Sequence, residues 1–169
     1  MSQAQLAPIG RNKHPHDAAL FFRRWLSNPL QMGSIIPSSP KLGALIAKQI
    51  EKRSHSIILE LGAGTGAITR SLIGSGISAG RITVVEIVPE MADHLRAKFP
   101  QTKVLQADAF NLPIELVKDP ASEIGTVICG IPLVLLSEAK QRQFIQQVEA
   151  VAPGPVSYTH LTLPTILRV

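Results

Sequence analysis

Three acidic side chains follow successive apolar segments of this chain, at spacings that allow them to hold one ligand. Glu60 lies near the end of the run that starts at Ile57, Glu86 ends the next run, and Asp108 follows a third. Glu86 comes 24 residues after Gly62, and Asp108 comes 22 residues after Glu86. Any one of them alone could be a surface acid, but three at regular intervals favour a common site. Because carboxylates attract cations and accept hydrogen bonds, the expected ligand contains an amine and hydroxyl groups.

Glycines directly follow the first of these acids. Gly62, Gly64 and Gly66 alternate with other residues, and without a Cβ they permit unusual backbone angles and a close approach of a ligand. A dinucleotide site instead has the pattern G-x-G-x-x-G, which holds a pyrophosphate at a helix N-terminus. An acid beside the turn, here Glu60, would repel a pyrophosphate. The glycine turn therefore favours a cationic or amine-bearing ligand.

The apolar pattern predicts the elements that position these residues. We expect an α/β fold, a Rossmann-like doubly wound parallel sheet with helices on both faces, because strand and helix patterns alternate. Ligands of such sheets bind at the C-terminal ends of the strands, where all three acids are expected, and Glu86 could there accept from both hydroxyls of a ribose. The predicted strands are 57–61, 81–87, 103–106 and 125–129, and the predicted helices are 67–73, 89–98 and 137–151, with N-terminal helices from residue 17 and over 40–52.

The expected domain boundaries follow from these elements. Residues 1–14 are polar and expected to be flexible, and a single domain is expected over residues 15–154. Within it, residues 15–53 form N-terminal helices and residues 55–154 form the Rossmann-like core. The segment at 30–40 is rich in Gly, Ser and Pro, and it could either fold over a ligand or serve only as a linker.

Composition narrows the function classes. The chain has 169 residues, is 45% hydrophobic, and contains no apolar run of about 18 residues that could span a bilayer. Its one cysteine, Cys129, lies in an apolar run, which indicates a buried thiol rather than a nucleophile. The five histidines show no spacing typical of metal ligands, so no metal is expected. These features are typical of a cytoplasmic protein.

The positive charge lies at the N-terminus. Residues 1–53 contain eight Lys/Arg and two acids, a balance of +6, whereas the remainder has nine Lys/Arg and ten acids, a balance of −1. This excess indicates an anionic partner, either lipid head groups or nucleic-acid phosphates. A helix with aromatic and basic residues lies there, and it suits a membrane interface, although packing on the protein's own core with solvated arginines is an equal alternative. Its residues include Phe21, Phe22, Arg23, Arg24 and Trp25.

The pattern Glu60-x-Gly62-x-Gly64-x-Gly66 resembles the first motif of class I methyltransferases that use S-adenosylmethionine (SAM). This resemblance implies that the acid and the glycine backbone hold the amino-acid end of SAM, that the second acid holds the ribose, and that the third holds the adenine amino group. The product would be S-adenosylhomocysteine. The cofactor-binding residues implied are Glu60, Gly62, Ala63, Gly64, Gly66, Glu86, Ile87, Asp108 and Ala109.

Residues 17–151 together resemble the bacterial phospholipid N-methyltransferases, which are related to the ribosomal RNA adenine dimethyltransferases. The resemblance rests on segments 21–26, 33–39 and 130–133. It implies methylation of phosphatidylethanolamine towards phosphatidylcholine by a monomer bound peripherally to the anionic inner face of the membrane. The five basic and aromatic residues of the N-terminal helix would contact the lipid.

The segment Gly130-Ile131-Pro132-Leu133 is the acceptor-side candidate, because in this family it borders the transferring methyl group. Adenine N6-methyltransferases have an Asn or Asp at the first position of this segment, which accepts a hydrogen bond from the exocyclic amine. At its last position they have an aromatic residue, which stacks on the base. Gly130 and Leu133 can do neither, so nucleic acid is a less favoured acceptor. An adenine methyltransferase and an inactive cofactor-binding fragment stay open as alternatives, and the sequence identifies no catalytic base.

Residues 155–169 resemble no part of the family and look like translated adapter sequence, so we expect a non-native tail. The family's sheet continues at this point with its last antiparallel strands. The sheet of this chain is therefore expected to be truncated and to have an exposed edge.

Overall fold

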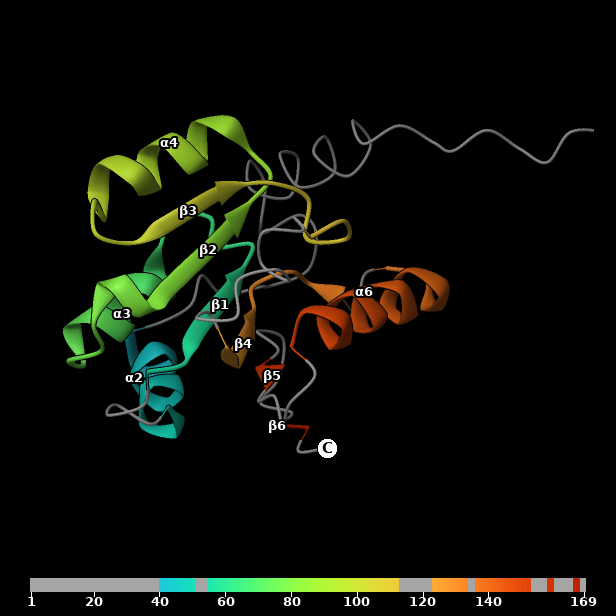
Figure 1. Ribbon diagram of the computed structural model, residues 1–169, viewed down its shortest axis with the longest axis horizontal. Coiled ribbons are helices and arrows are strands. Elements are labelled where there is room, and N and C mark those ends of the chain that lie inside the picture. The colour runs from blue at the N-terminus through green and yellow to red at the C-terminus, as the bar shows by residue number, and fades with distance from the viewer. Residues whose placement is uncertain are drawn as a thin grey trace, which may run out of the picture.

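The computed structural model describes residues 40–50, 55–112, 123–133, 136–152, 158–159 and 166–167. Its centre is a four-stranded parallel sheet with the strand order β3-β2-β1-β4 (Figure 1). The helices described with it cover both faces, which confirms the Rossmann-like α/β fold. The strands are β1 (Ile57–Leu61), β2 (Ile82–Glu86), β3 (Lys103–Gln106) and β4 (Ile124–Cys129).

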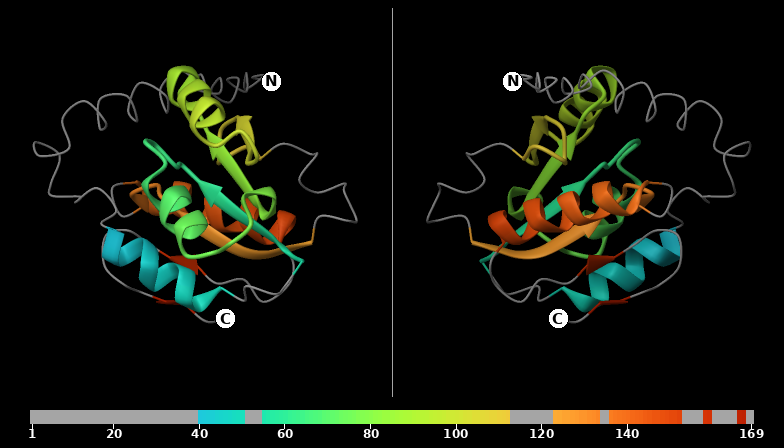
Figure 2. Two further views of the ribbon diagram at one scale, coloured as in Figure 1. Left: turned by 90° about the vertical axis from the view of Figure 1, so that its left-hand side faces the viewer. Right: turned by 90° about the vertical axis from the view of Figure 1, so that its right-hand side faces the viewer.

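Two apolar clusters cover the two faces of this sheet. On one face, Ile58 of β1 and Val84 of β2 pack with residues of α2, α3 and α4. On the other face, Leu59 and Val85 pack with Phe144 and Val148 of α6. Figures 1 and 2 show α2 beside α3, and α6 apart from both. The helices are α2 (Pro40–Gln49), α3 (Ala67–Gly74), α4 (Pro89–Lys98) and α6 (Glu138–Val151), with a 3-10 turn η1 (Ala79–Arg81).

The sequence explains why these elements form. A parallel strand between two helical layers must be apolar on both faces, and all of β2 is buried. In contrast, β3 lies at one edge of the sheet and is partly exposed. Helix α4 begins at Pro89, whose fixed φ suits the first helical position. Serine is a favoured N-cap residue, and Ser137 occupies the N-cap of α6, but its side chain makes no capping hydrogen bond there.

The described residues differ from the predicted elements in small ways. Helix α2 ends at Gln49, three residues before the predicted end at Lys52. Residues Ala79–Arg81 form η1, and β2 therefore begins at Ile82 rather than at Arg81, where the strand was predicted to begin. The N-terminal predictions, the interfacial helix and the segment at 33–39 among them, lie outside the described residues.

Strand β4 forms the second edge of the sheet. Two short strands in the tail, β5 (Tyr158–Thr159) and β6 (Ile166–Leu167), pair with each other in a separate antiparallel sheet. Strand β5 lies beside β4 without joining its hydrogen-bonded ladder. The origin of the tail stays a prediction. Of the helices in the described segments, none is long and apolar enough to cross a membrane.

Candidate functional site

The turn after β1 has a backbone that favours glycine. Gly62, Gly64 and Gly66 have φ angles of 74°, 55° and 74°, in the left-handed region where side chains are strained. A Cβ at Gly66 would also lie 2.6 Å from a ring carbon of Phe99 and 2.7 Å from a methyl carbon of Leu95. The alternating glycines therefore permit both the path of the turn and the close packing of α4 beneath it.

Glu86, at the end of β2, links the glycine turn to the turn that follows β2. Its side chain is fully buried. Its Oε2 accepts a hydrogen bond from the Gly64 N–H at 2.9 Å, and its Oε1 accepts one from the Val88 N–H at 3.0 Å. A carboxylate can accept about four hydrogen bonds, so the Glu86 oxygens could also accept from ligand hydroxyls. The sequence predicted the position of Glu86 but not its two backbone partners, which depend on how the turns fold over it.

Glu60, on β1, is buried and only half satisfied. The hydroxyl of Thr69 on α3 donates to its Oε2 at 2.6 Å, whereas its Oε1 has no hydrogen-bond partner among the described residues. Burial raises the pKa of Glu60 to about 7; hydrogen bonds from Thr69 partly oppose that rise, and the negative charge of Glu86 adds to it. An ammonium group bound nearby would supply the missing partner and favour the ionised carboxylate.

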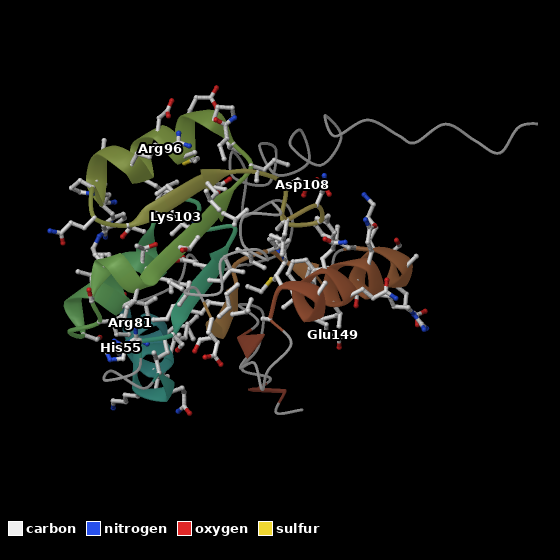
Figure 3. The ribbon with its side chains drawn as sticks, viewed as in Figure 1. His55, Arg81, Arg96, Lys103, Asp108 and Glu149 are labelled. Carbon is white, nitrogen blue, oxygen red and sulfur yellow. The ribbon has the colours of Figure 1, made fainter. Side chains whose placement is uncertain are left out.

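Asp108 comes two residues after β3 ends. Its Oδ1 accepts from the Phe110 N–H at 2.9 Å, which fixes the turn that follows the strand. Figure 3 shows Asp108 at the end of the sheet opposite to His55 and Arg81. The parallel register places the ends of β1, β2 and β3 side by side, with Glu86 opposite Gln106. The structure thus brings the three acids to one edge, as the sequence predicted.

The three apolar residues predicted to contact the cofactor flank these acids. Ala63 lies in the glycine turn and packs against the apolar cluster under α3. Ile87 and Ala109 each follow an acid by one residue and pack on the opposite cluster. Their backbones therefore lie beside the predicted ligand positions, and their contacts with the cofactor stay a prediction.

The acceptor-side segment 130–133 follows β4 and is buried. The Gly130 N–H donates to the Leu61 carbonyl at 2.7 Å, so β4 and β1 stay joined beyond the ends of their strands. A Cβ at Gly130 would lie 2.2 Å from the carbonyl oxygen of Gly62. This position therefore excludes any side chain, and Ile131, Pro132 and Leu133 give the segment an apolar character.

Cys129 precedes this segment and is buried. Its Sγ lies 3.5 Å from the Ile131 carbonyl oxygen, to which it can donate. Burial raises the pKa of the thiol to about 12, so Cys129 stays protonated and does not act as a nucleophile. Within the described part of the chain, no three His, Cys, Asp or Glu side chains gather into a metal site.

Residues 58–153 match the family of methyltransferase domains. The chain belongs to this family. The match includes the glycine turn, all three acids and the acceptor-side segment. The chain is therefore a SAM-dependent methyltransferase. That the glycine turn and the three acids hold SAM stays a prediction.

Two curated relatives are named for different acceptors. An ornithine lipid N-methyltransferase from Singulisphaera acidiphila is 26% identical over 149 residues, which are 86% of this chain and 78% of that protein. A ribosomal RNA small subunit methyltransferase A from Marinobacter nauticus is 30% identical over 168 residues, 89% of this chain and 56% of that protein. The methyltransferase thus spans only about half the length of the ribosomal RNA enzyme.

Solved structures share the fold. A glycopeptide N-methyltransferase in complex with SAM has a TM-score of 0.56 at 18% identity, over 70% of this chain and 52% of that one. A sugar N-methyltransferase from a Streptoalloteichus species has a TM-score of 0.52 at 17% identity, over 96% and 62%. These similarities confirm the Rossmann-like architecture of the methyltransferase.

The raised pKa of Glu60 predicts how the stability of the ligand-free protein varies with pH. This carboxyl has a higher pKa in the folded state, about 7, than the usual 4.5. Its contribution to the free energy of unfolding is therefore full below pH 4.5 and is lost as the pH rises through 7. Glu60→Gln should remove this loss and make the ligand-free protein more stable at pH 8, by at most about 3 kcal/mol.

Urea unfolding of wild type and Glu60→Gln at pH 5.5 and pH 8 measures this effect. Glu149→Gln, on the exposed face of α6, is the control for removal of a charge (Figure 3). The same change in stability between the two pH values for wild type and Glu60→Gln would show that Glu60 does not titrate in this range.

Proposed function

We propose that this methyltransferase transfers the methyl group of SAM to the amine of a membrane lipid, with phosphatidylethanolamine as the acceptor. The observation that carries the proposal is the apolar acceptor-side segment, in which Gly130 has no room for a side chain. A base-recognising enzyme needs an amide or acid there to accept from the exocyclic amine. A small aliphatic amine has no ring edge to recognise and needs only access to the methyl group.

The ornithine lipid N-methyltransferase supports a lipid acceptor, because the chain aligns with most of that protein. Ornithine lipid and phosphatidylethanolamine both present a primary amine at a membrane surface. The basic N-terminal segment, with its balance of +6, would favour such an anionic surface. We propose that the protein associates peripherally with the inner face of the membrane.

Ribosomal RNA is the second candidate acceptor, because a ribosomal RNA methyltransferase is 30% identical to the chain. The basic N-terminus would then bind phosphates. The absence of a side chain at Gly130 counts against this candidate, since the amine of adenine would lack its acceptor there.

The proposed reaction needs little from the protein beyond position. Bound SAM supplies a methyl group that its sulfonium activates. The chain's own residues hold the cofactor, through Glu60 and Glu86, and exclude water from the acceptor side through the apolar segment 130–133. An uncharged amine nitrogen would attack the methyl carbon while the carbon–sulfur bond breaks. S-adenosylhomocysteine would leave with the electron pair of that bond, and the methylated ammonium would release its proton to solvent. Proximity and alignment are the main contributions expected.

Transfer of a labelled methyl group tests the proposed acceptor. The protein is incubated with methyl-labelled SAM and, separately, with vesicles containing phosphatidylethanolamine, vesicles containing ornithine lipid, phosphatidylcholine vesicles, and ribosomal RNA. We expect label in phosphatidylethanolamine and none in phosphatidylcholine, which has no free amine. Label in ornithine lipid alone would show that ornithine lipid, and not phosphatidylethanolamine, is the acceptor. Label in RNA would refute a lipid acceptor. Binding of SAM without any transfer would indicate an inactive fragment.

The N-terminal helix gives a separate prediction. If its aromatic side chains enter the membrane interface, Phe22→Ser and Trp25→Ser together should weaken binding to anionic vesicles by about 30-fold or more, measured by co-sedimentation, since each buried ring contributes roughly 1–2 kcal/mol. Phe110→Ser, which removes a partly buried ring in contact with the buried ring of Phe144, is the control for loss of an aromatic residue. Equal sedimentation of all variants would favour packing of the helix on the protein's own core.

A further inference from the structure

Thr69 makes the one hydrogen bond to the Glu60 carboxylate that the described side chains provide. It is the third residue of α3 and is fully buried, so its hydroxyl has no access to water. The hydroxyl lies 2.6 Å from Oε2 of Glu60, the short distance typical of a hydrogen bond to an ionised carboxylate. Because one oxygen of Glu60 is held in this way, the direction of the other is also fixed.

We propose that Thr69 is a positioning residue for the cofactor: its hydroxyl holds one oxygen of Glu60 so that the other, Oε1, is kept for the ammonium group of SAM. Oε1 is buried and has no partner among the described residues. A buried polar atom without a partner costs free energy, which an incoming ammonium would recover. The inference depends on SAM as the cofactor and not on the identity of the methyl acceptor.

The Thr69 hydroxyl also favours the charged form of Glu60. Burial and the nearby Glu86 both raise the pKa of Glu60, and hydrogen bonds from Thr69 lower it. Since an ammonium binds the carboxylate and not the neutral acid, cofactor binding below pH 7 must release a proton. Affinity for the cofactor should therefore rise with pH and level off near the pKa of Glu60.

Few other titratable groups face Glu60. On β2, Glu86 lies nearby. On β4, Cys129 follows Ile128, the partner of Glu60, and so points to the opposite face of the sheet. The charged residues of the packed helices are exposed or at the rim: Lys41 and Lys48 of α2, Arg70 of α3, and on α4 Glu90, Asp93, His94, Arg96 and Lys98, of which Lys98 donates to the Thr65 carbonyl at 3.1 Å.

Two ligands separate positioning of the ammonium from general damage to the site. S-adenosylhomocysteine keeps the amino-acid end, whereas 5′-methylthioadenosine keeps the nucleoside and the sulfur but lacks that end. Calorimetry measures the affinity of wild type, Thr69→Val and Thr69→Ser for both ligands between pH 5.5 and 7.5. In this range the amino group of S-adenosylhomocysteine stays an ammonium, because the ligand's own carboxylate favours the charged form. Thr69→Ser is the control, because it keeps the hydroxyl and removes only a methyl group.

For wild type and Thr69→Ser, we expect affinity for S-adenosylhomocysteine to rise about tenfold from pH 5.5 and to level off near pH 7. Thr69→Val should bind it about tenfold more weakly at pH 6.5, with an affinity still rising at pH 7.5. Its affinity for 5′-methylthioadenosine should match that of wild type.

An unchanged pH profile in Thr69→Val, or an equal loss of affinity for both ligands, would overturn the positioning role. If Thr69→Val does not fold, Thr69→Ala takes its place with the same expectations. Failure of the folded wild-type protein to bind S-adenosylhomocysteine at any pH would overturn the inference together with the cofactor assignment. Transfer of the methyl group to RNA rather than lipid would leave it intact.

Discussion

Glu86→Ala is expected to weaken the binding of S-adenosylhomocysteine by about 100-fold or more. The substitution removes the acceptor for the Gly64 and Val88 N–H groups, which would both be left without partners. It also removes the predicted partner of the ribose hydroxyls. A hydrogen bond to a charged group contributes about 1.5–3 kcal/mol, so the loss of two or three such bonds is enough for this effect. Calorimetry measures it.

The Glu86 prediction needs a test for folding as well as for affinity. Glu86→Gln should give a smaller loss, because its amide oxygen can still accept from one of the two N–H groups while its NH2 opposes the other. Glu149→Ala, on the exposed face of α6, changes the charge equally and should bind as wild type does. Wild-type affinity in a folded Glu86→Ala variant would contradict both the ribose assignment and the role of Glu86 in fixing the turn.

Gly130→Ala is expected to disturb the cofactor site from the acceptor side. Its new methyl group would lie 2.2 Å from the Gly62 carbonyl oxygen, a backbone atom, so the glycine turn must move. Overpacking of this kind costs about 1–3 kcal/mol, and the displaced turn should lower affinity for S-adenosylhomocysteine at least tenfold. Thermal unfolding and calorimetry measure the two effects.

Gly74→Ala is the matched control for that substitution. Gly74 is the last residue of α3, and a Cβ there would meet nothing within 4 Å. It should leave affinity unchanged and stability unchanged or slightly raised, because alanine loses less conformational freedom on folding. Equal effects of Gly74→Ala and Gly130→Ala would refute the close approach between Gly130 and Gly62.

The sequence predicted the order of the site but not its hydrogen bonds. Regular spacing placed Glu60, Glu86 and Asp108 at successive strand ends, because each strand–helix unit of a parallel sheet returns the chain to the same edge. The bond from the Gly64 N–H to Glu86 joins two turns 22 residues apart. Such a bond depends on the left-handed angles of the glycines, which a sequence pattern permits but does not specify.

The hydrogen bond from Thr69 to Glu60 is a second contact that the sequence pattern does not specify. As the third residue of an apolar helix start, Thr69 carries no motif signal, and its role becomes visible only when α3 packs over β1. The sequence does contain one signal: a buried acid such as Glu60 needs a partner, and a small hydroxyl nine residues later lies in the first turn of the next helix.

Element boundaries were predicted best where local chemistry determines them. Pro89 opens α4 at the predicted residue, since its ring fixes the first helical φ. The 3-10 turn at Ala79–Arg81 was missed, because a segment rich in glycine and serine is compatible with many turns. In the sequence, Gly130 counts against an adenine acceptor because glycine has no side chain to bind the exocyclic amine. The structure shows in addition that no side chain could fit at this position.

A crystal structure with S-adenosylhomocysteine tests the central claim most directly. We expect the ligand across the C-terminal ends of β1, β2 and β3, with its ribose hydroxyls within hydrogen-bonding distance of Glu86, its adenine amino group near Asp108, and its ammonium on the side of Glu60. A ligand bound elsewhere, or in this place with its ribose away from Glu86, would contradict the account.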